Sequence, residues 1–194
     1  MKRIFDIIAS LIILTFFLPF GIIISLAILF SSKGGVFYIQ QRIGKNKKPF
    51  GLFKFRTMKP DSDKKGQLTV GKDNRITKVG SVLRKYKLDE FPQFLNVLFG
   101  QMSIVGPRPE VKEFVDLYTE EQLGILQVKP GITDLASLEY FEENTLLGRA
   151  EDPRKTYVEE IMPAKIALNK KYLENPTIGN DLKIMWRTAL KIMF

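Results

Sequence analysis

The chain has 194 residues, of which 45% are hydrophobic and 26% charged, so it is long enough for one folded domain and too apolar for a disordered chain. It contains no cysteine and no histidine, which excludes disulfide bonds, Cys-based zinc sites and catalysis by Ser-His or Cys-His pairs. Lys and Arg outnumber Asp and Glu by 30 to 21, and residues 42–87 alone carry fifteen basic and three acidic side chains. Such a segment is typical of proteins that bind nucleic acid, phosphorylated ligands or anionic lipid, although a solvated lysine-rich surface gives the same count.

Residues 7–30 form an uncharged, mostly apolar run. About 20 apolar residues span the hydrocarbon layer as a helix, and this run is longer than the apolar part of a secretory signal, so we expect a retained membrane anchor. Pro19 lies near its middle and basic residues flank both ends. Two geometries are therefore open: a kinked transmembrane helix, or a helix broken at Pro19 that enters one leaflet and returns. Asp6 and Arg3 are three residues apart, which predicts an ion pair on one helical face.

The remaining chain is predicted to combine a small β-hairpin with several helices, without internal repeats or a linker. Residues 36–41 and 50–56 read as two strands around a turn, and a loop is expected over residues 60–74. Helices are predicted over residues 79–86, 89–99, 110–127 and 153–173. Residues 181–194 are predicted to form a helix with a basic stripe and an apolar body, which suits either the membrane interface or docking on the protein core.

The most informative local pattern is the acidic pair Asp89-Glu90. Asp89 can cap a helix and Glu90 fits its first turn, so capping alone would explain the pair. The pair also follows the basic segment and precedes the stiff turn 106–109, in which two prolines restrict the backbone around Arg108. A guanidinium binds phosphate oxygens through two parallel hydrogen bonds, and a carboxylate among cations suits phosphoryl transfer as a nucleophile or Mg²⁺ ligand. The sequence has no Walker A motif, so an ordinary ATP site is not expected.

A series of motifs follows in a fixed order along the chain. They are Lys2-Arg3-Ile4-Phe5-Asp6, the Pro-centred apolar helix, Gln41-Arg42-Ile43-Gly44, Lys54-Phe55-Arg56-Thr57-Met58, Leu88-Asp89-Glu90, Gln93-Phe94-Leu95-Asn96-Val97-Leu98, Gly100-Gln101-Met102-Ser103, Val105-Gly106-Pro107-Arg108-Pro109 and Lys129-Pro130-Gly131-Ile132-Thr133. In this order they closely resemble the monotopic phosphoglycosyl transferases, bacterial sugar transferases that begin glycoconjugate and polysaccharide assembly. The resemblance covers nearly the whole chain.

The resemblance implies an architecture. The fold would be α+β and mostly helical, with a re-entrant membrane helix over residues 1–33 that breaks at Pro19. Residues 34–194 would form a catalytic domain with a small β-hairpin and amphipathic interfacial helices. This domain would lie on the cytoplasmic face of the bacterial inner membrane.

The resemblance also implies a reaction. A phospho-sugar would pass from a UDP-sugar to polyprenyl (undecaprenyl) phosphate through a covalent aspartyl-phospho-sugar intermediate, with release of UMP. Asp89 would be the nucleophile and a ligand of Mg²⁺, and Glu90 its dyad partner. The implied phosphate-binding cations are Lys54, Arg84 and Arg108.

Two positions depart from the family's pattern. The usual Ser-Pro pair at the helix break is Leu18-Pro19 here, so the break rests on Pro19, Gly21 and packing. The Gly-Trp-Ala-Gln common after Gly-Ile-Thr is replaced by residues 134–137, Asp-Leu-Ala-Ser. The identity of the sugar therefore does not follow from the resemblance.

Other function classes are open on the residues alone. A membrane-tethered nucleic-acid-binding protein would use the basic segment, with Phe50, Phe53 and Phe55 as stacking platforms. A non-catalytic scaffold would dock on anionic lipid and recruit glycosyltransferases. The first gives no role to the Asp89-Glu90 pair, and the second predicts that a substitution of Asp89 leaves function intact. We expect the enzyme, with membrane lipids and downstream glycosyltransferases as further partners and no nucleic acid.

Overall fold

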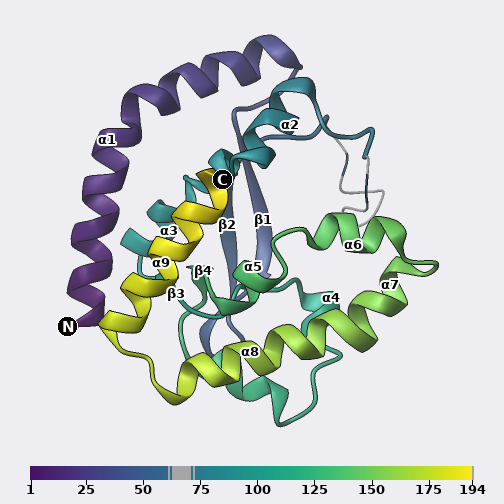
Figure 1. Ribbon diagram of the computed structural model, residues 1–194. Helices are drawn as coiled ribbons and strands as arrows, with labels where there is room; N and C mark the ends of the chain where they lie inside the picture. The colour runs from purple at the N-terminus through teal and green to yellow at the C-terminus, as the bar shows by residue number, and fades with distance from the viewer. Residues whose placement is uncertain (61, 63–70, 72, 194) are drawn as a thin grey trace.

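The computed structural model describes all residues except 61, 63–70, 72 and 194, and it shows a mostly helical α+β fold, as predicted (Figure 1). Most of the loop expected over residues 60–74 lies outside the described residues. The helices and strands are α1 (Lys2–Ser31), β1 (Phe37–Ile43), β2 (Pro49–Phe55), α2 (Lys78–Lys85), α3 (Gln93–Leu98), β3 (Ser103–Val105), α4 (Lys112–Val115), β4 (Gly131–Thr133), α5 (Leu135–Glu139), α6 (Glu143–Arg149), α7 (Pro153–Thr156), α8 (Met162–Glu174) and α9 (Ile178–Met193).

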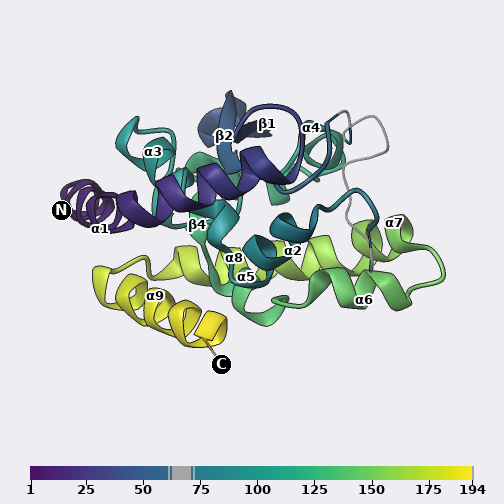
Figure 2. The same cartoon turned by 90° about the horizontal axis from the view of Figure 1, so that it is seen from above.

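The described strands form two separate sheets. Strands β1 and β2 pair antiparallel, which confirms the predicted hairpin. Its turn places Asn46 and Lys47 at φ values of 56° and 60°, a conformation that non-glycine residues other than Asn and Asp seldom adopt. Strands β3 and β4 form a short parallel pair from segments far apart in the chain. The hairpin and the helices α8 and α9 lie on opposite sides of the molecule (Figure 2).

The parallel pair positions the turn that carries Arg108. The Gly106 amide donates to the Thr133 carbonyl at 3.1 Å, and the Gly131 amide donates to the Pro107 carbonyl at 3.0 Å. A Cβ atom on Gly131 would lie 2.1 Å from the Gly106 nitrogen, so the two backbones approach more closely than any side chain permits. Glycine at these positions therefore fixes where Arg108 leaves the backbone.

The helix break predicted at Pro19 does not form: α1 continues through this residue, and its axis bends in its middle part (Figure 1). It contacts α3, α2 and β3. The Phe17 ring stacks on Phe91 with ring centroids 3.8 Å apart, next to the residues of the acidic pair. The bend and this stacking let one helix cover both α2 and α3, so α1 is packed against the segment that carries the acidic pair.

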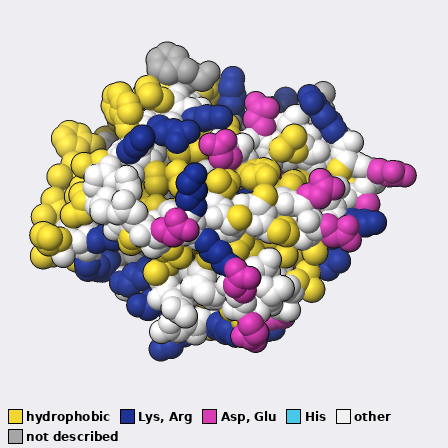
Figure 3. Space-filling model, turned by 60° about the horizontal axis from the view of Figure 1, so that its bottom comes forward, with side chains coloured by type: hydrophobic (Ala, Val, Ile, Leu, Met, Phe, Trp, Pro, Cys, Tyr) yellow, Lys and Arg dark blue, Asp and Glu magenta, His cyan; other side chains and the backbone are white. Residues whose placement is uncertain are grey.

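The outer surface of α1 is apolar. The helix is long and apolar enough to cross a membrane, and most of its large apolar side chains are exposed. Hydrophobic side chains gather along the edge of the molecule that α1 forms, whereas Lys, Arg, Asp and Glu alternate over the rest of that view (Figure 3). This surface suits association with a membrane, because exposed apolar patches of this extent are rare on water-soluble proteins.

The ion pair predicted between Asp6 and Arg3 is wrong. Asp6 is buried, and its carboxylate accepts hydrogen bonds from the Ser103 hydroxyl at 2.8 Å and the Ile104 amide at 3.2 Å. Arg3 donates instead to the Val97 and Leu98 carbonyls at the end of α3. Carbonyls at a helix C-terminus lack intrahelical partners, and β3 offers donors to the carboxylate, so each charged group finds a partner outside α1.

We predict that Asp6→Ala destabilises the protein by about 2–4 kcal/mol, because two buried donors in β3 lose their acceptor. The midpoint of thermal unfolding in detergent, compared with the exposed-site control Asp116→Ala, would measure this effect. Equal midpoints for the two variants would contradict the tether between α1 and β3.

The helix predicted over residues 110–127 is wrong. The chain forms only the single turn α4 and a 3-10 helix over Gln122–Gln127, separated by a turn in which the Thr119 amide binds the Gln122 side chain. The helix predicted over residues 153–173 forms as α7, a π-helical turn over Tyr157–Ile161, and α8. Helix α9 docks on the protein core through the buried Ile184, which confirms one expectation for the C-terminus, while Trp186 is exposed.

Candidate active site

The acidic pair lies in a 3-10 helix over Leu88–Glu90, not in the helix predicted over residues 89–99. Lys87, at φ 53°, turns the chain sharply after α2, and Pro92 is the residue before α3. Asp89 therefore does not cap a helix, and its side chain points into the protein, where it is 5% exposed. Helix capping therefore does not explain the acidic pair, and the two carboxylates must have another role.

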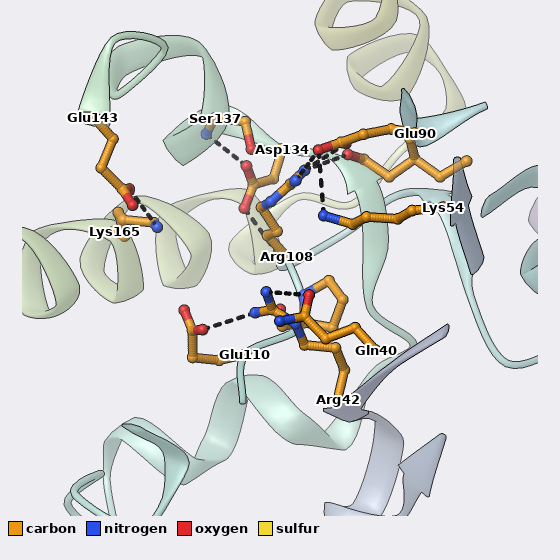
Figure 4. A network of polar contacts seen from close by, with 12 residues as sticks. Gln40, Arg42, Lys54, Glu90, Arg108, Glu110, Asp134, Ser137, Glu143 and Lys165 are labelled. Carbon is orange, nitrogen blue, oxygen red and sulfur yellow. Dashed lines mark hydrogen bonds and ion pairs between the residues drawn. The ribbon is translucent and has the colours of Figure 1, made fainter. Parts of the chain in front are cut away.

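Glu90 is held by two cations from distant segments (Figure 4). Arg108 forks onto it, with Nη1 at 3.0 Å from Oε2 and Nη2 hydrogen-bonded to Oε1. The Lys54 Nζ atom, from β2, lies 3.8 Å from Oε1. Arg108 Nη1 also donates to the Ile132 carbonyl at 3.2 Å, which fixes the plane of the guanidinium. The fork expected of Arg108 exists, and within the protein it is directed at Glu90.

The two adjacent carboxylates differ in their surroundings. Burial opposes ionisation of Glu90, but the charges of Arg108 and Lys54 outweigh it and hold the pKa of Glu90 far below its ordinary value. Burial and the neighbouring charge of Glu90 raise the pKa of Asp89, against the attraction of Lys54 and Arg84. Asp89 Oδ1 is buried and has no hydrogen-bond partner among the described residues. One carboxylate is thus a fixed anion and its neighbour has an unused oxygen.

All five predicted polar site residues line one cavity of about 590 Å³. They are Lys54, Arg84, Asp89, Glu90 and Arg108. Their elements are far apart in sequence, and the volume is in the range of ligand pockets. Pro19, the predicted helix break, is not among the residues that line the cavity.

A second polar group on the cavity wall was missed by the sequence reasoning. Glu110 accepts hydrogen bonds from Arg42 Nη1 at 2.9 Å, the Tyr157 hydroxyl at 2.5 Å and the Val111 amide at 3.0 Å. Burial opposes ionisation of Glu110, but Arg42 and Lys165 keep its pKa below the ordinary value. Glu110 directly follows the turn 106–109, so its place beside that turn was the one available signal.

Asp134 links the turn that carries Arg108 to the start of α5. Its carboxylate accepts a hydrogen bond from the Arg108 amide at 3.1 Å and caps α5 by accepting from the Ser137 amide at 2.6 Å. Asp134, the first of the four residues 134–137 that depart from the family's pattern, therefore supports the backbone of Arg108. Ser137 Oγ is buried without a partner among the described residues and belongs to a residue that lines the cavity.

Comparison with known proteins places the whole chain in one family. The model of the family described as bacterial sugar transferase matches residues 1–194. The chain is 39% identical over 194 residues to the UDP-glucose:undecaprenyl-phosphate glucose-1-phosphate transferase of Klebsiella pneumoniae, which covers 98% of this chain and 39% of that protein. It is 37% identical over 194 residues to the uncharacterized sugar transferase EpsL of Bacillus subtilis, with 100% of this chain and 87% of that protein covered.

A third relative is the exopolysaccharide production protein ExoY of Rhizobium meliloti, 34% identical over 203 residues that cover 96% of this chain and 83% of that protein. The chain thus spans less than half of the Klebsiella protein and most of EpsL and ExoY. Because the family match extends from the first to the last residue, this protein belongs to the bacterial sugar transferase family.

Proposed function

We propose that the protein transfers a sugar phosphate from a UDP-sugar to polyprenyl phosphate and releases UMP. The observation that carries the proposal is the buried Asp89 Oδ1, which has no hydrogen-bond partner in the described part of the chain and belongs to a residue that lines a cavity with Glu90, Lys54, Arg84 and Arg108. The named transferase activity of the Klebsiella relative supports the same substrates.

In the first step, Asp89 Oδ1 attacks the β-phosphorus of the UDP-sugar. The bond from that phosphorus to the bridging oxygen breaks, UMP leaves with the electron pair, and the sugar phosphate becomes bonded to the Asp89 carboxyl as an acyl phosphate. In the second step, an oxygen of the polyprenyl phosphate attacks the same phosphorus and the bond to Asp89 breaks. The Asp89 carboxylate is restored, and the product is a polyprenyl diphospho-sugar. Neither step needs a histidine or cysteine, consistent with the composition.

The cations of the cavity have separate tasks in this scheme. Glu90 accepts hydrogen bonds from both terminal nitrogens of Arg108 and so holds the guanidinium in place. The second N–H of Arg108 Nη2 has no hydrogen-bond partner among the described residues and is available for a phosphate oxygen. Lys54 and Arg84 add positive charge to the same cavity. Preorganised cations stabilise the charge that develops on the diphosphate as UMP leaves.

We propose Mg²⁺ as the cofactor, held by Asp89. Among the described residues no group of three or more acidic side chains could enclose a metal ion. Mg²⁺ nevertheless often binds through one or two carboxylates and substrate phosphates, so the oxygen of the Asp89 carboxylate that does not attack phosphorus could serve as its protein ligand. When bound, Mg²⁺ would neutralise charge on the diphosphate.

We also propose that residues 1–33 anchor the protein in one leaflet of the bacterial inner membrane, with the catalytic domain, residues 34–194, on its cytoplasmic face. The exposed apolar side chains of α1 and the exposed Trp186 of α9 support membrane contact at these helices. The bend in the middle part of α1 and the proline inside this helix support re-entry of the chain on the same side. A polyprenyl acceptor would reach the cavity from that surface.

The proposal is tested by incubating the detergent-solubilised protein with undecaprenyl phosphate, Mg²⁺ and a panel of UDP-sugars. We expect UMP and a lipid-linked diphospho-sugar in equal amounts with at least one donor. The intact mass of the protein incubated with that donor alone should increase by one esterified sugar phosphate. Product without any adduct would refute the covalent route, and no product with any UDP-sugar would refute the proposed donor class.

Lys54 predicts a pH dependence. Burial lowers the pKa of Lys54 from 10.5 to about 8, with help from the charges of Arg108 and Arg42, although the negative charge of Glu90 acts in the opposite direction. Lys54 is therefore positive below about pH 8 and loses its charge above it, so kcat/KM for the anionic UDP-sugar should fall as the pH rises through about 8. In Lys54→Arg the charge persists, so the same fall should be absent from initial rates measured between pH 7 and pH 9.5. A wild-type profile that stays flat over this range would contradict the assignment.

A further inference from the structure

A second polar network, partly buried, lines the cavity at a distance from the acidic pair. Glu110 lies at its centre and receives hydrogen bonds from Arg42 and Tyr157. Arg42 also donates to the Gln40 side chain at 2.9 Å and to the Pro109 carbonyl at 3.0 Å. Figure 4 shows the Arg42–Glu110 pair apart from the Glu90–Arg108–Lys54 group, within the same cavity. The proposed mechanism gives this network no task.

Two further charged side chains extend the network. Lys165 donates to Glu143 at 2.7 Å, and its Nζ atom lies 5.3 Å from the centre of the Tyr157 ring. Tyr157 itself lies in the π-helical turn between α7 and α8. Short π-helical segments often occur at functional sites, because the extra residue redirects a side chain. Four separate elements thus bring polar side chains to one part of the wall.

The two parts of the cavity differ in charge. The part with the acidic pair combines three cations with two carboxylates, and Lys87 adds a further cation beside Asp89. In the second network the charges of Arg42 and Lys165 are balanced by Glu110 and Glu143. A diphosphate is stabilised by an excess of cations, whereas paired charges offer hydrogen-bond donors and acceptors without net attraction for an anion.

We propose that the network of Arg42, Glu110, Tyr157, Lys165 and Glu143 binds the sugar of the donor, with Glu110 as the residue that discriminates between sugars. This inference rests on the proposed function, which supplies the UDP-sugar. Sugar hydroxyls need donors and acceptors in a fixed array, and a carboxylate held by three hydrogen bonds is such a fixed acceptor.

The network has unused hydrogen-bonding capacity for hydroxyl groups. Lys165 has three N–H donors, of which Glu143 uses one. Arg42 Nε is buried and has no partner among the described residues. Glu110 Oε2 accepts from Tyr157 and keeps a second lone pair. These groups converge on the cavity, so a hydroxylated ring there would satisfy them, whereas a planar uracil face would leave them unpaired.

Binding of the sugar is tested apart from chemistry in an Asp89→Asn background, where the donor should bind without reacting. Calorimetric titrations with UDP and with UDP-glucose, UDP-galactose and their two N-acetylated counterparts give the contribution of each sugar. We expect Glu110→Gln to weaken binding of the preferred UDP-sugar by about 10-fold or more, because a charge-assisted hydrogen bond to the sugar is lost. Binding of UDP should weaken by less than about 2-fold. The affinities of the four donors should also converge.

The matched control is Glu113→Gln, since Glu113 is also paired with an arginine, Arg154, but lies exposed outside the cavity. It should leave every affinity unchanged. If Glu110→Gln does not fold, Tyr157→Phe provides the same test, because it removes one hydrogen bond to Glu110. It should weaken binding of the preferred UDP-sugar more than binding of UDP. Equal weakening of UDP and UDP-sugar, or no change in the preference among sugars, would overturn the proposal.

The two proposals fail in different experiments. If the wild-type protein forms no lipid-linked product while the UDP-sugar preference depends on Glu110, the transfer reaction is wrong and the sugar site stands. If product forms and the preference is independent of Glu110 and Tyr157, the sugar site is wrong and the transfer reaction stands.

Discussion

Asp89→Asn is expected to abolish transfer, with a fall in turnover of about 10³-fold or more, as for the removal of other covalent nucleophiles. The amide has almost the shape of the carboxyl group but cannot form the ester with the sugar phosphate. Initial rates of UMP release with undecaprenyl phosphate and the preferred UDP-sugar would measure the loss. Intact mass of the variant incubated with donor should show no adduct.

The same variant, Asp89→Asn, is expected to be at least as stable as the wild type. Burial raises the pKa of Asp89, which means that the folded state disfavours its charged form, and Oδ1 accepts no hydrogen bond from the described residues. A neutral amide should therefore leave the midpoint of thermal unfolding unchanged or higher. Asp116→Asn, an exposed substitution of the same kind, should keep full activity. Normal turnover in Asp89→Asn would contradict the assignment of the nucleophile.

Arg108→Lys is expected to lower kcat/KM by about 10²-fold or more, because one ammonium group cannot replace a guanidinium that binds Glu90 with two nitrogens and a phosphate with a third N–H. The structure adds a second consequence. With the fork lost, burial would raise the pKa of Glu90 from its present low value towards or above the ordinary range. Glu90 would then be protonated, and the site impaired, at a pH where the wild-type residue is still an anion.

Initial rates of UMP release between pH 5 and pH 8 test this shift. In Arg108→Lys the activity should decline on the acid side at a higher pH than in the wild type. Arg154→Lys is the matched control, since Arg154 forms an exposed pair with Glu113 and should leave the profile unaltered. An acid limb that stays in place while kcat/KM falls would mean that Arg108 acts on the substrate alone and does not control Glu90.

Local signals were sufficient to predict several parts of the protein. The uncharged run of residues 7–30 predicts the long apolar helix, and the turn between residues 44 and 49 predicts the hairpin. The acidic pair Asp89-Glu90 and the proline-bounded Arg108 are visible as local patterns, whereas the roles expected of them followed from the resemblance of the ordered motifs to a family. All of these features depend on neighbours within about one or two turns of chain, which a sequence displays directly.

Other parts were decided by contacts between distant segments. Asp6 pairs with β3 and not with Arg3, the helix expected after residue 110 is interrupted, and Asp89 does not cap a helix. The Glu110 network joins β1, the segment after Pro109 and the π-helical turn. These segments lie far apart in the sequence. Burial removes water as an alternative partner, so each charged group must bind whatever the fold places beside it. The sequence alone determined which chemical groups are present and which local elements they favour. Only the tertiary structure decided which of those groups are paired and which, like Asp89 Oδ1, are left available.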